Sequence, residues 1–206
     1  MAFTDYTSYA SLLDNFNRSN EGPPPSGSWN AGAVSTGTSQ LQVVSNALKR
    51  GGAGWGSGYW GTQIGADVIA YMTLSTVGDV ELGVRAKDLG SGSTFDYYGA
   101  EYISSTHTLT LYKYTNGSGS SLGTSTTATL AGGDKYGIMA IGSNITVATY
   151  QSGSWTDRIT ASDATYGATG YITIWMNGTT PIIDDLYAGQ ITSASYTPRA
   201  MLLGMG

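Results

Sequence analysis

The chain contains no cysteine and a single histidine, and only 11% of its 206 residues are charged. Without cysteine there can be no disulfide, and with one histidine a zinc site built from several thiolate or imidazole ligands is excluded. The net charge of −5 argues against the basic surface that nonspecific nucleic-acid binding requires. The missing cysteines leave the cellular compartment open.

Long apolar segments are also absent. No run of about 18 apolar residues occurs, so we expect no membrane-spanning helix. Residues 1–6 carry neither a basic segment nor a long apolar stretch, so we expect no signal peptide.

The composition favours strands and tight turns. The chain has 30 glycines and 15 tyrosines and is rich in serine and threonine. Threonine and tyrosine suit a pleated surface, and glycine suits bends. The clearest strand is residues 80–87, where Val80, Leu82, Val84 and Ala86 face one way, while Asp79, Glu81, Arg85 and Lys87 would face solvent.

Further strands follow at short intervals. Residues 41–44 and 68–74 each predict a strand, whereas residues 51–61, rich in glycine, predict a loop, a kinked strand, or both. Residues 99–103 and 109–114 predict a hairpin, as do residues 136–141 and 145–150. Asn177-Gly178 predicts a turn before residues 182–187. Roughly ten to thirteen short strands and no long helix indicate an all-β protein, an antiparallel β-sandwich or barrel.

Several segments resemble one known family. Residues 13–21 (LDNFNRSNE), followed by Ser28-Trp29, resemble the opening of concanavalin A-like lectin/glucanase (LamG-like) jelly-roll domains of the kind found in bacteriophage virion proteins and also in secreted bacterial proteins. Residues 109–114, 130–137 and 170–174, the last leading into 184–189 (DDLYAG), fit the same pattern. The resemblance covers about residues 12–190. It implies two packed antiparallel sheets, one of them concave, on a scaffold that hosts lectins, hydrolases and structural parts.

The expected organisation is an N-terminal arm at residues 1–12, a concanavalin A-like sandwich at 13–189 and a C-terminal docking tail at 190–206. The tail is apolar, and it either folds back on the sandwich or docks on another chain. Because both ends look like interaction arms, we expect a homo-oligomer.

Candidate catalytic groups are sparse. Asp79 and Glu81 share one strand face, but a third carboxylate is missing, and a solvated strand face explains them. Glu101 with Asp96 is a looser pair, and His107 is expected in a surface turn. The glycine-rich residues 51–58 lack the Lys-Ser/Thr that a phosphate loop needs. We therefore expect no catalytic residues and no enzyme activity.

Two kinds of binding site are predicted. A structural calcium ion would use Asp14, Asn17, Asp184 and Asp185 if the first and last strands pair; otherwise these side chains cap turns. A carbohydrate would pack on aromatic rings. The candidate rings are Trp55, Tyr59, Trp60, Tyr112, Tyr114 and Trp175, and the alternative for each is a place in the core.

The leading hypothesis is a non-enzymatic phage virion structural protein, either a capsid decoration protein or a tail or fibre component. It would lie in the virion and contact other virion proteins through its terminal segments, with contact to host glycans as a secondary role. The alternative is a secreted, extracellular bacterial carbohydrate-binding module. A third hypothesis is a glycoside hydrolase with an unusual active site.

Overall fold

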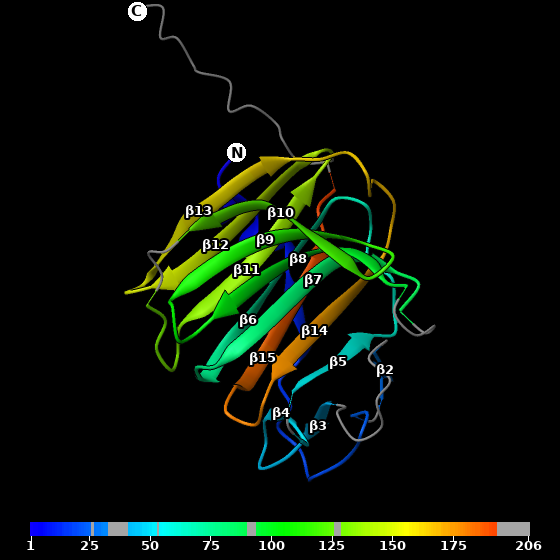
Figure 1. The fold of residues 1–206 in the computed structure, drawn as a ribbon. Helices are drawn as coiled ribbons and strands as arrows, with labels where there is room; N and C mark the ends of the chain where they lie inside the picture. Colours follow the sequence, from blue (N-terminus) through cyan, green and yellow to red (C-terminus); the bar gives the residue numbers. More distant parts are fainter. Residues whose placement is uncertain (26, 33–40, 53, 90–93, 126–128, 193–206) are drawn as a thin grey trace, which may run out of the picture.

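The computed structural model describes residues 1–25, 27–32, 41–52, 54–89, 94–125 and 129–192. Within these ranges the chain forms one short 3-10 helix, η1 (Phe3–Tyr9), and strands β1 to β15. Two antiparallel sheets pack face to face (Figure 1). The fold is therefore the all-β antiparallel sandwich that the sequence predicted. None of the helical residues described forms a segment long and apolar enough to cross a membrane.

The eight-stranded sheet has its strands in the order β13-β12-β11-β6-β15-β4-β3, with β1 pairing with β15. Its strands are β1 (Ser11–Asp14), β3 (Leu41–Val43), β4 (Leu48–Arg50), β6 (Val68–Thr76), β11 (Lys135–Ile141), β12 (Asn144–Gln151), β13 (Ser154–Ser162) and β15 (Ile182–Gln190).

The seven-stranded sheet has the order β10-β9-β8-β7-β14-β5-β2. Its strands are β2 (Trp29–Ala31), β5 (Trp55–Trp60), β7 (Asp79–Lys87), β8 (Asp96–Ile103), β9 (Thr108–Thr115), β10 (Ser118–Ser125) and β14 (Tyr171–Asn177).

The main core lies between the two sheets. Alternate apolar residues of each strand point into it, for example Val80 and Leu82 from β7 and Val68 and Ala70 from β6. This follows from the period of two in strand side chains, which places every second residue on the same face. The outer face of each sheet carries a smaller apolar cluster of its own.

Both predicted hairpins are confirmed, since β8 pairs with β9 and β11 with β12. The glycine-rich residues 51–61 include a true strand, β5. Asn177-Gly178 lies between two strands as expected, but these strands belong to different sheets. The turn therefore carries the chain across the sandwich and closes no hairpin.

One prediction about β7 is wrong. Arg85 has a positive φ of 53°, and the pairing of β7 with β8 shifts between Val84 and Lys87. This bulge reverses the faces of the residues that follow, so Ala86 joins the apolar cluster on the outer face of the sheet instead of the core. Arg85 does not face solvent, because its buried guanidinium donates to the carbonyl oxygens of Gly142 and Tyr166 at 2.8 and 2.7 Å.

The two ends of the described chain pack on the eight-stranded sheet. Phe3 of η1 is fully buried in a small cluster with Ile69, Met139 and Ile191 on the outer face of that sheet. β1 pairs with β15, with Leu12 opposite Tyr187. Phe3 in the predicted N-terminal arm and Ile191 near the start of the predicted tail are thus packed within the chain. The rest of that tail, residues 193–206, lies outside the described residues.

Candidate functional site

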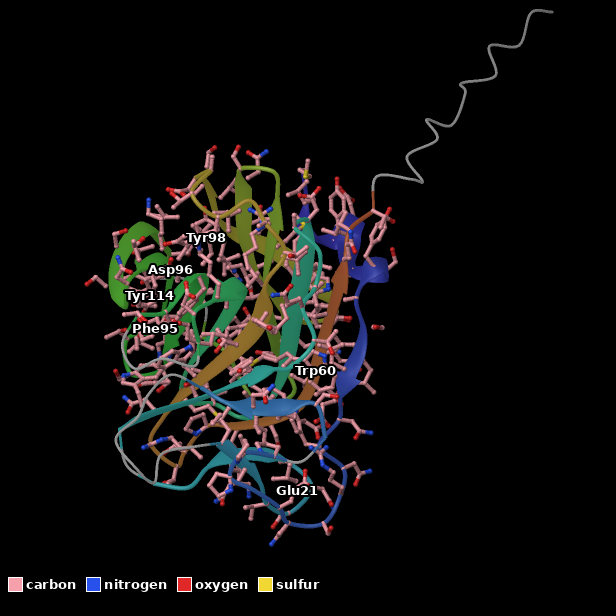
Figure 2. The ribbon with its side chains drawn as sticks, turned by 90° about the vertical axis from the view of Figure 1, so that its right-hand side faces the viewer. Glu21, Trp60, Phe95, Asp96, Tyr98 and Tyr114 are labelled. Atoms are coloured by element: carbon pink, nitrogen blue, oxygen red, sulfur yellow. The ribbon has the colours of Figure 1, made fainter. Side chains whose placement is uncertain are left out.

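A hollow of about 210 Å³ opens on the outer face of the seven-stranded sheet. We call it the acidic hollow. Its lining residues are Trp55, Glu81, Phe95, Tyr97, Glu101, Tyr114 and Trp175. Figure 2 shows Phe95 and Tyr114 on the side of the sandwich that faces away from η1 and β15. Five adjacent strands and the residue that precedes β8 supply the lining, so the rigid sheet fixes the shape of the hollow.

Two glycines make room for the floor. Gly83 of β7 and Gly99 of β8 are opposite each other in register. A Cβ on Gly83 would lie 2.7 Å from Tyr97 Cδ2, and one on Gly99 would lie 2.7 Å from Glu81 Oε1. The ring of Tyr97 and the carboxylate of Glu81 can therefore lie flat on the sheet only because both positions lack a side chain.

Glu81 is the buried acid of the site, with only 2% of its surface exposed. Its Oε1 accepts a hydrogen bond from the hydroxyl of Tyr97, and its Oε2 accepts one from the hydroxyl of Tyr114 at 2.9 Å. Burial raises the pKa of Glu81 to about 7, although the two tyrosine hydrogen bonds oppose this shift. The expectation that Asp79 and Glu81 form a solvated strand face is therefore wrong for Glu81.

Glu101 lies directly opposite Glu81 across β7 and β8. It is half-buried, and its pKa is raised by burial and then by the negative charge of Asp79. Asp79 itself is engaged elsewhere, since its Oδ1 accepts hydrogen bonds from the backbone N–H and the hydroxyl of Ser104 at 2.9 and 2.8 Å. Glu101 is thus the carboxylate that a ligand in the hollow can reach.

Aromatic rings form the walls. Phe95 lies 4.9 Å from Trp175 and 5.7 Å from Tyr114, measured between ring centroids. The ring of Trp175 is 7% exposed, and its Nε1–H has no acceptor among the described residues. A buried indole N–H without an acceptor is unfavourable by about 1–3 kcal/mol. This nitrogen is itself buried, so Trp175 contributes its ring, and not its N–H, to the wall of the hollow.

The structure brings together three of the six predicted carbohydrate-contacting residues, Trp55, Tyr114 and Trp175. Tyr59 and Tyr112 lie beside the hollow, where Tyr59 packs on Tyr171 at 5.2 Å and Tyr112 on Tyr114 at 5.6 Å. Trp60 lies elsewhere. It packs against the main core and meets the ring of Trp29 edge-on at 5.8 Å.

The other candidates for chemistry lie outside the hollow. Asp96 lies 3.6 Å from Lys87 and accepts the backbone N–H of Asn116 at 2.6 Å, so it does not pair with Glu101. His107 occupies an exposed turn between β8 and β9, as predicted.

Sequence reasoning missed Phe95, Tyr97 and the two floor glycines. The expected strand began at Gly99, whereas β8 begins at Asp96. The available signal was one isolated glycine in each of two neighbouring strands. A glycine inside a strand often marks a place where another group packs closely against the sheet.

The four predicted calcium ligands do not fit a calcium site. β1 and β15 pair as expected, but both carboxylate oxygens of Asp14 accept hydrogen bonds from the guanidinium of Arg18, at 2.6 and 3.0 Å. The Oδ2 atom also accepts the indole N–H of Trp29 at 2.8 Å. The Asp184 side chain is exposed, and so is Asn17. In the described part of the chain, no three acidic or histidine side chains gather as a metal site.

Solved structures share this fold. The carbohydrate-binding module CBM66 from Bacillus subtilis superposes with a TM-score of 0.64 at 12% identity, over 79% of this chain and 96% of the module. The exoplasmic/lumenal domain of VIP36, in a form bound to calcium and mannose, gives 0.61 at 10% identity, over 90% of this chain and 91% of that domain. A protein of unknown function with a galectin-like fold from Bacillus subtilis gives 0.59 at 10% identity, over 79% of this chain and 89% of that one.

No family model and no curated protein matches the sequence. At these identities the structural likeness establishes a lectin-like sandwich fold.

Proposed function

We propose that this chain is a non-enzymatic carbohydrate-binding protein that holds a neutral saccharide in the acidic hollow. One observation carries the proposal. Five aromatic rings, those of Trp55, Phe95, Tyr97, Tyr114 and Trp175, line one hollow together with the half-buried carboxylate of Glu101. A sugar hydroxyl can donate to the Glu101 carboxylate, while the rings of Phe95 and Trp55 pack against the C–H faces of the sugar.

The charge of the hollow favours a neutral ligand. Its lining contains Glu81 and Glu101 and no lysine or arginine. A uronic or sialic acid would bring a third carboxylate against these two, and like charges at short range in a partly buried site repel strongly. The expected ligand is therefore an uncharged hexose or pentose unit of a longer glycan.

The geometry favours binding over hydrolysis. Retaining glycosidases use two carboxyl groups that flank the scissile bond, and both must reach the sugar. Glu81 is 2% exposed and each of its oxygens accepts a tyrosine hydroxyl. Its role in the proposal is to hold the Tyr97 and Tyr114 rings in place.

A neutral-glycan array followed by calorimetry on the sugar found tests the proposal. We expect binding that weakens about tenfold in Trp55→Ala, which removes a ring that packs on the sugar, and in Glu101→Gln, which removes the charge from a hydrogen-bond acceptor. Lys49→Met, on β4 of the other sheet, is the matched control and should bind like the wild type. Equal affinity in all three variants would refute the assignment of the hollow. Release of reducing sugar by the wild type, lost in Glu81→Gln, would refute a non-enzymatic role.

A second candidate function is that of a phage virion component that displays this glycan-contacting face, together with other virion proteins and further copies of itself. It is favoured by the resemblance of residues 13–21 to the opening of virion jelly-roll domains. A secreted bacterial module is the alternative setting for the same hollow. The neighbouring reading frames distinguish the two, because capsid or tail genes would support the virion role and polysaccharide-degrading genes would contradict it.

A further inference from the structure

A second hollow, of about 290 Å³, lies on the outer face of the eight-stranded sheet, beside the end of η1. We call it the lysine hollow. It is lined by Thr7, Ser8, Tyr71, Lys135, Tyr150 and Trp155. It is separated from the acidic hollow by the full thickness of the sandwich, because the two open on the outer faces of different sheets.

Aromatic rings form its walls in a continuous series. The rings of Tyr71 and Tyr187 stack with centroids 4.7 Å apart and planes 17° apart. Trp155 meets Tyr71 at 5.3 Å and Tyr150 at 5.4 Å. Such a wall, bordered by the hydroxyl-bearing residues Thr7 and Ser8, suits a sugar ring for the same reasons as the walls of the acidic hollow.

This hollow is lined by a cation, Lys135, whereas the acidic hollow is lined by two carboxyl groups. The ammonium nitrogen of Lys135 lies 5.2 Å from the ring centroid of Tyr187, 5.8 Å from Tyr71 and 5.9 Å from Tyr150. Among the described residues it has no carboxylate within 4 Å, whereas Lys113 has Asp163 at 2.8 Å. The ring faces hold the cation by cation–π attraction and leave its ion-pairing capacity unused.

Asp185 is the carboxylate whose charge acts on Lys135. Lys135 and Asp185 are both register partners of Thr73, from its two sides. Their backbones are therefore two strand spacings apart, about 10 Å across the sheet, and the Lys135 ammonium reaches toward β15, where it lies 5.2 Å from the Tyr187 ring. Trp155 and Tyr150 belong to β13 and β12, which lie on the opposite side of β11 from β15. A carboxylate bound against these rings therefore approaches the Lys135 ammonium from the side away from Asp185, which would repel it.

We infer that the lysine hollow binds a saccharide bearing a carboxylate, such as a uronic acid unit. The carboxylate pairs with Lys135, and the sugar ring packs against Trp155 and Tyr71. This inference stands on a different sheet and different residues from the proposed neutral site, so either can fail alone.

The probes are α-1,4-linked trigalacturonate and its neutral counterpart, α-1,4-linked galactotriose, titrated into the ¹⁵N-labelled full chain. We expect trigalacturonate to shift the indole N–H signal of Trp155 and the amide signals of Thr7 and Ser8, and we expect added salt to weaken this binding. Galactotriose should bind there about tenfold more weakly, because it lacks the charge-assisted contact.

Three variants sharpen the test. Lys135→Met keeps the length of the side chain and should weaken trigalacturonate about tenfold. Asp185→Asn should strengthen it, because the competing carboxylate is removed. Lys49→Met, three strands away on β4, removes an equal charge and should change nothing.

Circular dichroism on each variant verifies that it is folded. Equal binding of the two trisaccharides, unchanged affinity in Lys135→Met, or no shift at Trp155 with either probe would each overturn the inference.

Discussion

Gly83 and Gly99 are register partners on neighbouring strands, and the ring of Tyr97 occupies the space above both of them. Because these two residues have no side chain, their backbone forms the floor of the acidic hollow. The tyrosine and the carboxylate of Glu81 lie where two Cβ atoms would otherwise stand.

Gly99→Ala is expected to damage the hollow. The new Cβ would lie 2.7 Å from Glu81 Oε1 and 2.8 Å from Tyr97 Cε2. Both groups would have to move, which should destabilise the fold by roughly 1–3 kcal/mol and weaken binding of any saccharide found for this site. Urea melts and calorimetry measure the two effects. Gly167→Ala is the control, because a Cβ there meets nothing within 4 Å; equal losses in both variants would contradict the floor model.

Glu81 should make stability depend on pH. Its pKa rises from an ordinary value of 4.5 to about 7 on folding, so the folded state holds the proton more tightly than the unfolded state does. The resulting stabilisation is fully present below pH 4.5 and is lost as the pH rises toward 7. At 1.36 kcal/mol per pKa unit, the loss is on the order of 3 kcal/mol.

Urea denaturation across this pH range measures the effect. Glu81→Gln keeps the shape of the side chain but does not titrate, so its stability should fall less than that of the wild type over the same interval. A wild-type curve parallel to that of Glu81→Gln would show that this carboxyl does not titrate as its burial requires.

Asp163 should contribute to stability in the opposite pH direction. Its Oδ1 accepts the hydroxyl of Tyr98 at 2.7 Å and its Oδ2 accepts the ammonium of Lys113 at 2.8 Å. Burial would raise the pKa of Asp163, but the hydrogen bonds from Lys113, Thr165 and Tyr98 outweigh it and lower the pKa. The stabilisation is present above the ordinary pKa of 3.8 and is lost as the pH falls below it.

Asp163→Asn should cost about 2 kcal/mol near neutral pH, because charge-assisted hydrogen bonds are lost. The difference from the wild type should shrink in strong acid. A difference that is constant with pH, measured by thermal melting, would contradict the assigned contacts.

Gly137→Ala should loosen η1. A Cβ at this position on β11 would lie 2.7 Å from Phe3 Cζ, 2.6 Å from Tyr71 Cβ and 2.5 Å from the carbonyl oxygen of Ala70, so β6 must shift as well as η1. We expect a loss of roughly 1–3 kcal/mol and faster amide hydrogen exchange in residues 3–9, with β8 and β9 unaffected. Exchange that rises equally throughout the chain would mean that the substitution disturbs the whole sandwich.

Much of the fold could be predicted because strand period and turn residues are local signals. The pairing of β8 with β9 and of β11 with β12 follows from alternating residues around short polar turns. The bulge at Arg85 could not be predicted, because it depends on carbonyl oxygens of Ala66, Gly142 and Tyr166 that come from distant parts of the chain. With the bulge missed, the residues after it were placed on the wrong face.

The candidate site was predicted less fully. Trp55, Tyr114 and Trp175 stand out in a sequence as large rings in strand-like segments, and they line one hollow. Trp60 has the same appearance but lies against Trp29 and the core, because which face a ring occupies depends on strand register. The burial of Glu81 depends on Tyr97 and Tyr114, from two neighbouring strands, and no single segment contains that information.

The two hollows open in opposite directions, so one folded chain would carry two separate saccharide-binding sites. A folded copy with both filled would stand between two polysaccharide strands, one uncharged and one acidic, and would tie them together without any second copy. Cross-linking of a mixed gel by the monomer is the behaviour that such a two-sided sandwich makes possible.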